Sequence, residues 1–404
     1  EYYFRVRERW IGKKRHYNLK SPYVLRWRLE ELKKGDEREP NDEVYKATEF
    51  NVNVNASGYL GHVGDVDFYK IHLKDLGDET RLHVSLSRLK GVSFKATLYD
   101  GLMKQLLVRT GKRGRPLVFR NLKLPRPKPF FFVKVEAKKG FNPREGYVLG
   151  VGRDAAGKDG VEREPNDALN MAMFLQKERG KLYGILESKG DKDSYRLNTT
   201  RSKTLKLSVK PEEDMDLKVK LFDRRGRHQL TANAGRKGFA EVLPNVRVRP
   251  GDFYIQVANA TKKDASTGRY TLQWRLMRIE KGDEAEPNNK MSQATRLFTR
   301  ISARGYIYPP GDRDFYRFKL RGRRASTGRV SITVQGIPKV RLKLSLLDGV
   351  KNVLKESSRR SFAGVRKVEV NLHVGKWYYL RVEDSDGRRS NPTDSYELEV
   401  VRKW

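Results

Sequence analysis

The stretch Glu37-Arg38-Glu39-Pro40-Asn41-Asp42, followed by Gly64-Asp65-Val66-Asp67-Phe68-Tyr69, decides how this chain is organised. It recurs as Glu162-Arg163-Glu164-Pro165-Asn166-Asp167 with Gly190-Asp191-Lys192-Asp193-Ser194-Tyr195, and again as Glu284-Ala285-Glu286-Pro287-Asn288-Asn289 with Gly311-Asp312-Arg313-Asp314-Phe315-Tyr316. We call the first segment the acidic box and the second the GDxD strand. Successive boxes begin 125 and 122 positions apart. A period this long is that of whole domains, each with its own core, and not that of a solenoid.

Hydrophobic periodicity predicts that each unit is built from short β-strands. The runs 68–73, 94–99, 217–222 and 342–347 alternate apolar with basic or polar residues, which is the pattern of a half-buried strand. The last three runs end in Asp and turn-forming residues. Gly58, Gly184 and Gly305 are expected to mark a turn before the GDxD strand. No long segment has the period of a helix, so the sequence predicts an all-β fold: a tandem array of antiparallel, jelly-roll-like β-sandwiches.

The ends of the units indicate the domain boundaries. Tyr23, Tyr147, Tyr270 and Tyr396 each open a short apolar run and lie 124, 123 and 126 positions apart. The chain therefore holds four copies of the end of the repeat and three of its beginning. We expect residues 1–33 to be the closing β-hairpin of a truncated upstream repeat, as in a processed protein or an internal fragment. Sandwiches follow over residues 34–156, 157–279 and 280–404. Because an isolated hairpin is marginal in water, residues 1–33 should pair with other strands.

The composition is strongly basic, with 86 Lys and Arg against 50 Asp and Glu and a net charge of +36. Such a field favours a polyanionic partner, such as an acidic protein, an acidic polysaccharide, an anionic membrane face or nucleic acid. Basic residues at outward strand positions also have a purely protective use against edge-to-edge aggregation. Cysteine is absent, which excludes disulfides, thiol catalysis and zinc–thiolate sites. No apolar run reaches the roughly 18 residues of a membrane span.

The acidic box has the composition of a site for a hard cation. In units one and two it offers three carboxylates and one amide oxygen within six residues, and Ca²⁺ takes about six to eight such oxygen ligands. The two Asp of the GDxD strand could add carboxylates from a neighbouring loop. Turn and capping chemistry is the alternative: Asn-Asp would cap the short amphipathic stretch that follows, and Asp-x-Asp would form an Asx turn. The residues themselves leave both interpretations open.

The acidic box, the GDxD strand, a mid-domain Asp-Gly turn and the closing aromatic strands occur together in order. This combination resembles the bacterial pre-peptidase C-terminal (PPC) domain family, which includes the collagen-binding domains of clostridial collagenases. The resemblance covers three tandem copies and the end of a fourth. It implies a secreted β-sandwich without catalytic activity, attached to or cleaved from an extracellular enzyme. It also implies that the box and the acids after it hold Ca²⁺.

Carried over residue by residue, the resemblance implies a calcium site in each unit. The implied ligands are Glu37, Glu39, Asn41, Asp42, Asp65 and Asp67 in unit one, Glu162, Glu164, Asn166, Asp167, Asp191 and Asp193 in unit two, and Glu284, Glu286, Asn288, Asp312 and Asp314 in unit three. Unit three has Asn289 where the other boxes end in Asp. Because this change removes a charge, calcium is expected first in units one and two.

No catalytic constellation recurs in the three units. The six histidines do not occupy matching positions, and no metalloprotease, nucleophile-elbow or phosphate-loop motif is present. Asp65 and Asp67 have the residue types of a general acid–base pair. A pair that is repeated in every unit, however, indicates architecture. The sequence therefore predicts a protein that is not an enzyme.

These observations lead to one main functional hypothesis. We expect an exported bacterial protein (periplasmic, cell-surface or extracellular) whose tandem domains bind or scaffold through basic faces in a larger assembly. The expected partner is an acidic protein or acidic polysaccharide surface, since linked weak sites multiply affinity. One alternative is the C-terminal accessory region of a secreted hydrolase, binding substrate or polysaccharide. Another is nucleic-acid binding, suggested by the charge and by aromatic residues such as Trp10 and Trp27.

Overall fold

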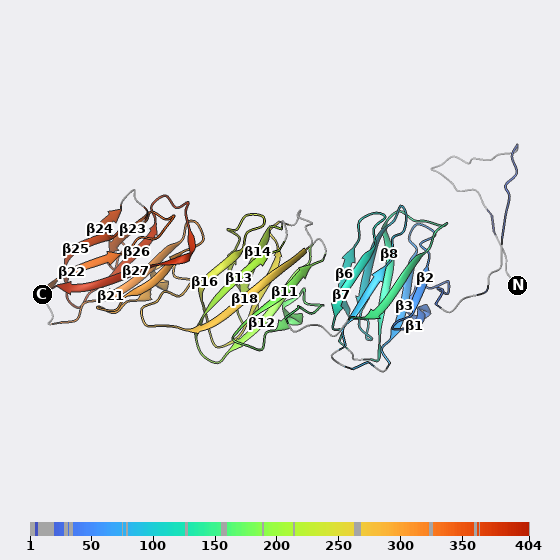
Figure 1. Ribbon diagram of the computed structural model, residues 1–404, viewed down its shortest axis with the longest axis horizontal. Helices are drawn as coiled ribbons and strands as arrows, with labels where there is room; N and C mark the ends of the chain where they lie inside the picture. The colour runs from blue at the N-terminus through green and yellow to red at the C-terminus, as the bar shows by residue number, and fades with distance from the viewer. Residues whose placement is uncertain are drawn as a thin grey trace.

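A computed structural model of the chain describes residues 5–6, 20–27, 31, 35–74, 76–77, 80–125, 128–154, 160–187, 190–212, 215–261, 268–322, 326–358, 362 and 364–403. Over these residues the strands form three β-sandwiches that follow one another in a row (Figure 1). Each sandwich has one five-stranded and one four-stranded sheet. The prediction of tandem, all-β sandwich domains is therefore confirmed. A search of the described helices for one able to cross a bilayer finds none.

Unit one begins with a short 3₁₀ helix, η1 (Val44–Lys46), and continues entirely in strands. These are β1 (Thr48–Asn51), β2 (Asn55–Gly58), β3 (Val66–His72), β4 (Leu82–Leu86), β5 (Ser93–Tyr99), β6 (Gln105–Thr110), β7 (Leu117–Leu122), β8 (Phe130–Lys139) and β9 (Tyr147–Arg153). The two sheets have the orders β1-β3-β8-β5-β6 and β2-β9-β4-β7. β1 lies parallel to β3, and the other neighbours are antiparallel.

Units two and three repeat this arrangement. Unit two comprises η2 (Leu169–Met171), β10 (Met173–Phe174), β11 (Arg179–Leu186), β12 (Lys192–Thr199), β13 (Lys203–Pro211), β14 (Leu217–Phe222), β15 (His228–Ala232), β16 (Glu241–Val248), β17 (Gly251–Asn259) and β18 (Gly268–Arg278). Unit three comprises η3 (Met291–Gln293), β19 (Thr295–Arg296), β20 (Ala303–Ile307), β21 (Arg313–Lys319), β22 (Thr327–Val334), β23 (Leu342–Leu347), β24 (Val353–Ser358), β25 (Arg366–His373), β26 (Trp377–Asp384) and β27 (Asn391–Lys403). Their sheets are β10-β12-β17-β14-β15 with β11-β18-β13-β16, and β19-β21-β26-β23-β24 with β20-β27-β22-β25.

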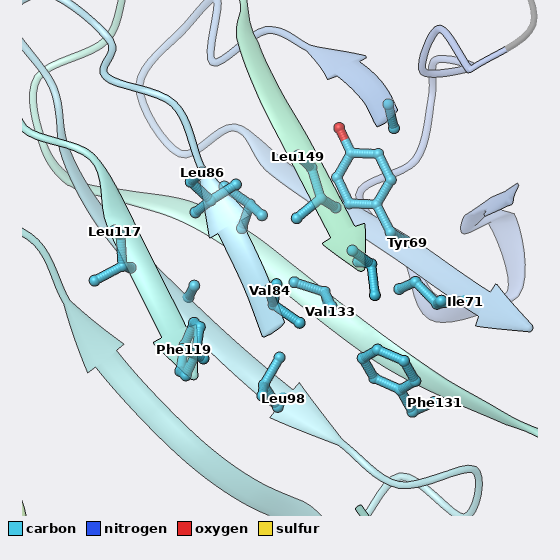
Figure 2. Packing of buried hydrophobic residues seen from close by; sticks show 14 of the residues in the cluster. Tyr69, Ile71, Val84, Leu86, Leu98, Leu117, Phe119, Phe131, Val133 and Leu149 are labelled. Atoms are coloured by element: carbon cyan, nitrogen blue, oxygen red, sulfur yellow. The ribbon is translucent and has the colours of Figure 1, made fainter. Parts of the chain in front are cut away.

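Each unit has a hydrophobic core of its own between its two sheets. In β3 every second side chain is buried, because successive residues of a strand point to opposite faces of the sheet. Figure 2 shows the result in unit one, where Ile71 and Phe131 from one sheet pack with Val84 and Leu149 from the other. Three separate cores agree with three units that fold as domains.

The last two strands of each unit do not form the predicted hairpin. β8 pairs with β3 and β5, whereas β9 pairs with β2 and β4 in the opposite sheet. The pairs β17/β18 and β26/β27 are divided between sheets in the same way. Both strands carry buried residues, such as Val133 and Leu149, that face each other across the core. The closing motif is therefore a crossover between sheets, and the sequence pattern alone cannot distinguish it from a hairpin.

The segment predicted to close an upstream repeat, residues 1–33, lies mostly outside the described residues. Residues 20–27 are described and belong to no strand. Tyr23, Val24 and Trp27 expose 73%, 75% and 69% of their surface. The strand expected to begin at Tyr23 is thus not formed over residues 23–27.

Successive units are joined through the acidic box of the later unit. The backbone amide of Lys123 donates to the carbonyl of Glu164 (2.6 Å), and the amide of Glu164 donates to the carbonyl of Asn121 (3.1 Å). The second box therefore pairs in parallel with β7, at the edge of the four-stranded sheet of unit one. At the next junction, the amide of Arg247 donates to the carbonyl of Glu286 (2.7 Å). The third box therefore pairs in parallel with β16 in the same way.

Candidate metal centres at the domain junctions

Each acidic box lies against the start of its own GDxD strand. The amide of Phe68 donates to the carbonyl of Asn41 (3.0 Å), Ser194 to Asn166 (3.0 Å) and Phe315 to Asn288 (3.1 Å). The Glu–Pro peptide bond of each box is cis. The predicted site residues of each unit are therefore gathered in one region, beside the first residues of β3, β12 or β21.

The side chain of the last residue of each acidic box accepts a hydrogen bond from the first backbone amide of β3, β12 or β21. Asp42 accepts a hydrogen bond from the amide of Val66 (3.1 Å), Asp167 from that of Lys192 (3.0 Å) and Asn289 from that of Arg313 (2.9 Å). An amide oxygen accepts this bond as a carboxylate does, so Asn289 preserves the geometry of the box. None of η1, η2 and η3 has a side-chain cap. The predicted helix-capping role is therefore wrong, and the residue caps a strand.

The first Asp of each GDxD closes the preceding loop. Asp65 Oδ2 accepts from the amide of Gly61 (2.6 Å), Asp191 Oδ2 from that of Glu187 (2.6 Å) and Asp312 Oδ2 from that of Tyr308 (2.9 Å). All three carboxylates are buried. One oxygen of each thus closes the loop before the strand. This is not the predicted Asx turn, because the bonded amide lies four residues before the Asp and not two residues after it.

A network of two carboxylates and two tyrosines lies behind each box. In unit two the hydroxyl of Tyr270 donates to Asp193 Oδ2 (2.5 Å), and that of Tyr195 donates to Glu162 Oε2 (3.0 Å), while the two hydroxyls lie 2.6 Å apart. Unit one uses Glu37, Asp67, Tyr69 and Tyr147, and unit three uses Glu284, Asp314, Tyr316 and Tyr396. The second Asp of GDxD is therefore part of the core of its domain.

Three glycines make room for these tyrosine pairs. A Cβ on Gly184 would overlap the ring of Tyr270, and Gly58 and Gly305 meet the matching tyrosines. The sequence predicts turns at these glycines, but they lie within β11, β2 and β20. That prediction is wrong because the glycines are required for space and not for a turn conformation.

The carboxylates form three clusters. One oxygen from each member lies within 4.8 Å of the others in the sets Glu37–Glu39–Asp67, Glu164–Asp191–Asp193 and Glu284–Glu286–Asp314. Burial, reinforced by the neighbouring carboxylates, raises the pKa of Asp67 to about 9, that of Glu286 to about 9 and that of Glu284 to about 7. Such a cluster needs either protons or a cation, because charged carboxylates repel one another at short range.

In unit two the cation is an arginine supplied by unit one. Arg109 of β6 places its Nη2 2.8 Å from Glu164 Oε1 and 3.6 Å from Asp191 Oδ2, while Nη1 pairs with Glu187. Only 1% of the Arg109 side chain is exposed. Its Nη1 also donates to the carbonyl of Val118 (3.1 Å). The guanidinium therefore occupies the position that a metal ion would take between Glu164 and Asp191.

The third cluster has no such arginine among the described residues. Glu284, Glu286, Asp312 and Asp314 are buried, and none of them pairs with a described Lys or Arg. Glu286 Oε1, Asp314 Oδ1 and both side-chain polar atoms of Asn288 are buried without a hydrogen-bond partner. Unpartnered buried oxygens are costly, and an oxygen-binding cation would satisfy them together. These residues fit a calcium ion.

The first cluster is more open to solvent. Glu39 is exposed, Glu37 is half-buried, and Asp67 is fully buried. The amide nitrogen of Asn41 can be oriented to donate to Asp67 Oδ1 (3.2 Å). Nε2 of the exposed His62 lies 3.7 Å from Asp65 Oδ1 beside this cluster. This cluster offers an oxygen-lined site with direct access from solvent.

Sequence reasoning missed two parts of these sites. The regular spacing of the tyrosines indicated strand ends, and nothing in that spacing revealed the hydroxyl pairs. Arg109 has no counterpart in the repeat, because the equivalent positions in β15 and β24 are Ala232 and Ser357. One basic residue among 86 carries no signal of its own. Only the junction of the two domains identifies it.

Comparison with known proteins concerns the fold. No family model and no curated protein matches the sequence. Among solved structures, the chain is similar to the pre-peptidase C-terminal domain of a collagenase from Bacillus anthracis, with 22% identity and a TM-score of 0.23 over 28% of this chain and 99% of that domain. It is also similar to the PBSX exported protein XepA, with 12% identity and a TM-score of 0.19 over 55% and 85% of the two chains. A chain of Sulfolobus Turreted Icosahedral Virus shows 8% identity and a TM-score of 0.22 over 85% and 86%.

Proposed function

We propose that this chain is a non-catalytic, exported array of β-sandwich domains that binds an acidic partner through its basic exterior. The observation that carries this proposal is the segregation of charge. Among the described residues, thirteen acidic side chains are buried, against three basic ones, Arg81, Arg109 and Arg366. The exterior is therefore more basic than the net charge of +36. A surface of predominantly positive charge attracts a negatively charged partner and accelerates their association.

A cation on an outer sheet face is repeated in all three units. Lys70 of β3, Arg196 of β12 and Arg317 of β21 follow the equivalent tyrosines and lie over Phe130 (4.7 Å), Phe174 (4.9 Å) and Trp377 (5.3 Å). An aromatic ring beneath a Lys or Arg holds that cationic side chain in place, so less side-chain conformational entropy is lost when a partner binds. Three such sites on linked domains suit a repetitive acidic partner, since linkage multiplies weak affinities.

The proposal is tested by retention of the full chain on charged matrices. We expect binding to immobilised polygalacturonate, dextran sulfate or polyglutamate at low ionic strength, and no binding to neutral dextran. Elution should follow salt concentration, because exposed charges are screened. Equal retention on neutral dextran, or no retention on any acidic matrix, would contradict the proposed function.

We also propose that calcium neutralises the first and third clusters, whereas Arg109 does so in the second. Glu284, Glu286 and Asp314 would hold the ion in unit three, and Glu37, Glu39 and Asp67 would hold it in unit one. The ion would supply positive charge and complete the coordination of buried oxygens, with no catalytic step. Calcium sites of this structural kind are typical of extracellular modules, where free calcium is plentiful, which agrees with an exported protein.

Calorimetric titration of the chelator-treated chain with calcium tests this assignment. Asp314→Asn should remove the site of unit three and leave that of unit one. Asp386→Asn, at an exposed turn, is the matched control and should leave calcium binding at both sites unchanged. Absence of any calcium-dependent heat in the unmodified chain would refute the assignment.

A further inference from the structure

A groove lined by arginines lies at the junction of units two and three. It has a volume of about 780 Å³ and lies between the β14–β15 turn, the β16–β17 turn, η3 and β21. Six arginines line it: Arg224, Arg225, Arg227, Arg247, Arg249 and Arg317. The main-chain bonds between β16 and the third acidic box fix the two sides of the groove relative to each other.

The two acidic residues in the groove already have partners. Asp223 pairs with Arg227, whose Nη2 lies 2.7 Å from Oδ2. Asp252 accepts a hydrogen bond from Asn198 (2.7 Å) and lies 3.6 Å from Arg196 Nη1. Five exposed arginines remain, and none of them lies within ion-pair distance of a described carboxylate. Like charges gathered at one place repel one another, and this repulsion is relieved when an anion binds.

The fold itself does not require these arginines. The β5–β6 turn of unit one has the same hydrogen bonds, with Asp100 accepting from the amides of Leu102 and Lys104 (2.9 Å each), as Asp223 does from those of Arg225 and Arg227 (2.9 Å each). Unit one thus carries Leu102 where unit two carries Arg225. The arginine at the position of Arg225 is therefore a property of this junction, whereas Arg227, Arg247 and Arg317 have the basic equivalents Lys104, Lys123 and Arg196 at the first junction.

The other lining residues indicate the chemistry of the ligand. Guanidinium groups bind carboxylates and tetrahedral oxyanions in a bidentate manner. Ser292, Gln293 and Gln229 are exposed beside them and offer hydrogen bonds to neutral hydroxyl groups. Phe222 and Phe253 are half-buried and buried, so the described lining offers no exposed ring for stacking a nucleobase. It also lacks the open apolar pocket that anchors a peptide.

We propose that this groove binds a segment of an acidic polysaccharide, in which oxyanion groups (uronate or sulfate) meet the arginines and sugar hydroxyls meet the amide and hydroxyl side chains. This proposal rests on the proposed function and locates it at one junction. Arg317 is already held over the ring of Trp377, which positions its guanidinium at one side of the groove.

Fluorescence anisotropy of the full chain with labelled oligogalacturonate and with labelled dextran sulfate oligomers tests the proposal. In the test variant, Arg225→Gln and Arg249→Gln are combined. The matched control combines Arg115→Gln and Arg120→Gln, which removes the same charge from exposed positions of unit one. We expect the groove variant to bind at least one oligomer about tenfold more weakly, because charge-assisted hydrogen bonds are lost. The control should bind within about twofold of the unmodified chain, as expected for well-separated charges under screening. Whether the uronate or the sulfate oligomer shows the larger loss identifies the oxyanion.

The outcomes separate this proposal from the general one. Equal losses in the two variants would overturn the groove as the site and would leave binding through the basic exterior intact. Groove-dependent binding that is stronger for polyglutamate or single-stranded DNA would overturn the polysaccharide assignment. Failure of the unmodified chain to bind any of these polymers would overturn the proposed function itself. An unchanged melting temperature of both variants confirms that the folded state is retained.

Discussion

A single arginine distinguishes the second carboxylate cluster from the other two. Arg109 contacts Glu164, Asp191 and Glu187 from the neighbouring domain and is 1% exposed. Buried ion pairs contribute little net stability when compared with apolar residues, but removing one partner leaves an uncompensated charge. Arg109 is therefore both the internal cation of unit two and a connection between units one and two.

Replacing Arg109 by Met should lower the free energy of unfolding of unit two by roughly 3–5 kcal/mol, because three buried carboxylates lose their cation. Calorimetric unfolding scans measure this change. Arg120→Met on the exposed side of β7 is the control and should alter stability by less than about 0.5 kcal/mol. Added calcium should partly restore the Arg109 variant and leave the control unchanged. Equal stability of the two variants would show that Arg109 is not the resident cation.

The tyrosine pair provides a second test at the scale of single residues. Tyr270→Phe removes the donor to Asp193 in a site without exposed surface. We expect a loss of about 1–3 kcal/mol, the range for a buried polar group deprived of its partner. Tyr254→Phe on the half-exposed side of β17 should cost far less. Thermal denaturation followed by circular dichroism compares the two, and a similar effect of both would contradict the network.

At the scale of elements, the second and third acidic boxes each join two domains and begin one. The backbone of each box pairs with β7 or β16 of the preceding unit, while its side chains face β12 or β21 of its own unit. The carboxylates of the second and third boxes thus lie where two elements from different domains meet, whereas Glu37 of the first box bonds to Ser57 of its own unit.

The raised pKa of Asp67 predicts a specific pH dependence. When folded, the carboxyl keeps its proton up to about pH 9, whereas an unfolded Asp releases it near about pH 4. The folded state therefore binds more protons between these values, and stability must fall as the pH rises through this window. Melting temperatures measured in EDTA should decrease as the pH rises through this window, and the decrease should be smaller in the Asp67→Asn variant. Stability that rises with pH over the same range would contradict the raised pKa.

Elements with a strict period of two were predictable from sequence. The runs that became β3, β5, β14 and β23 alternate apolar and polar residues, and burial on one face requires that pattern. The pairing of the closing strands was not predictable. A buried residue such as Val133 gives the same alternating sequence pattern whether the two strands form a hairpin or lie in opposite sheets. The site residues came from the repeated box, since repetition marks a shared role. Arg109 of unit one and Arg225 of unit two have no basic equivalent in the other of these two units, where Ala232 and Leu102 take their places, so repetition could not reveal them.

At the scale of the whole molecule, the chain combines acidic interiors with a basic exterior. The three sandwiches follow one another along the array (Figure 1), and each presents an equivalent cation on its outer sheet, as Lys70, Arg196 and Arg317 show. A linear acidic polymer could contact several units at once, and its affinity would then depend on the number of linked units.

The affinity of the full chain for polygalacturonate, measured as a function of salt concentration, tests the central claim most directly. A polymer with condensed counterions releases them when several basic residues bind, so the logarithm of the affinity should fall steeply and linearly with the logarithm of salt between about 50 and 200 mM. This steep negative slope is the result we predict. An affinity that does not change with salt, or no measurable binding at the low-salt end, would contradict an exterior built to engage an acidic partner.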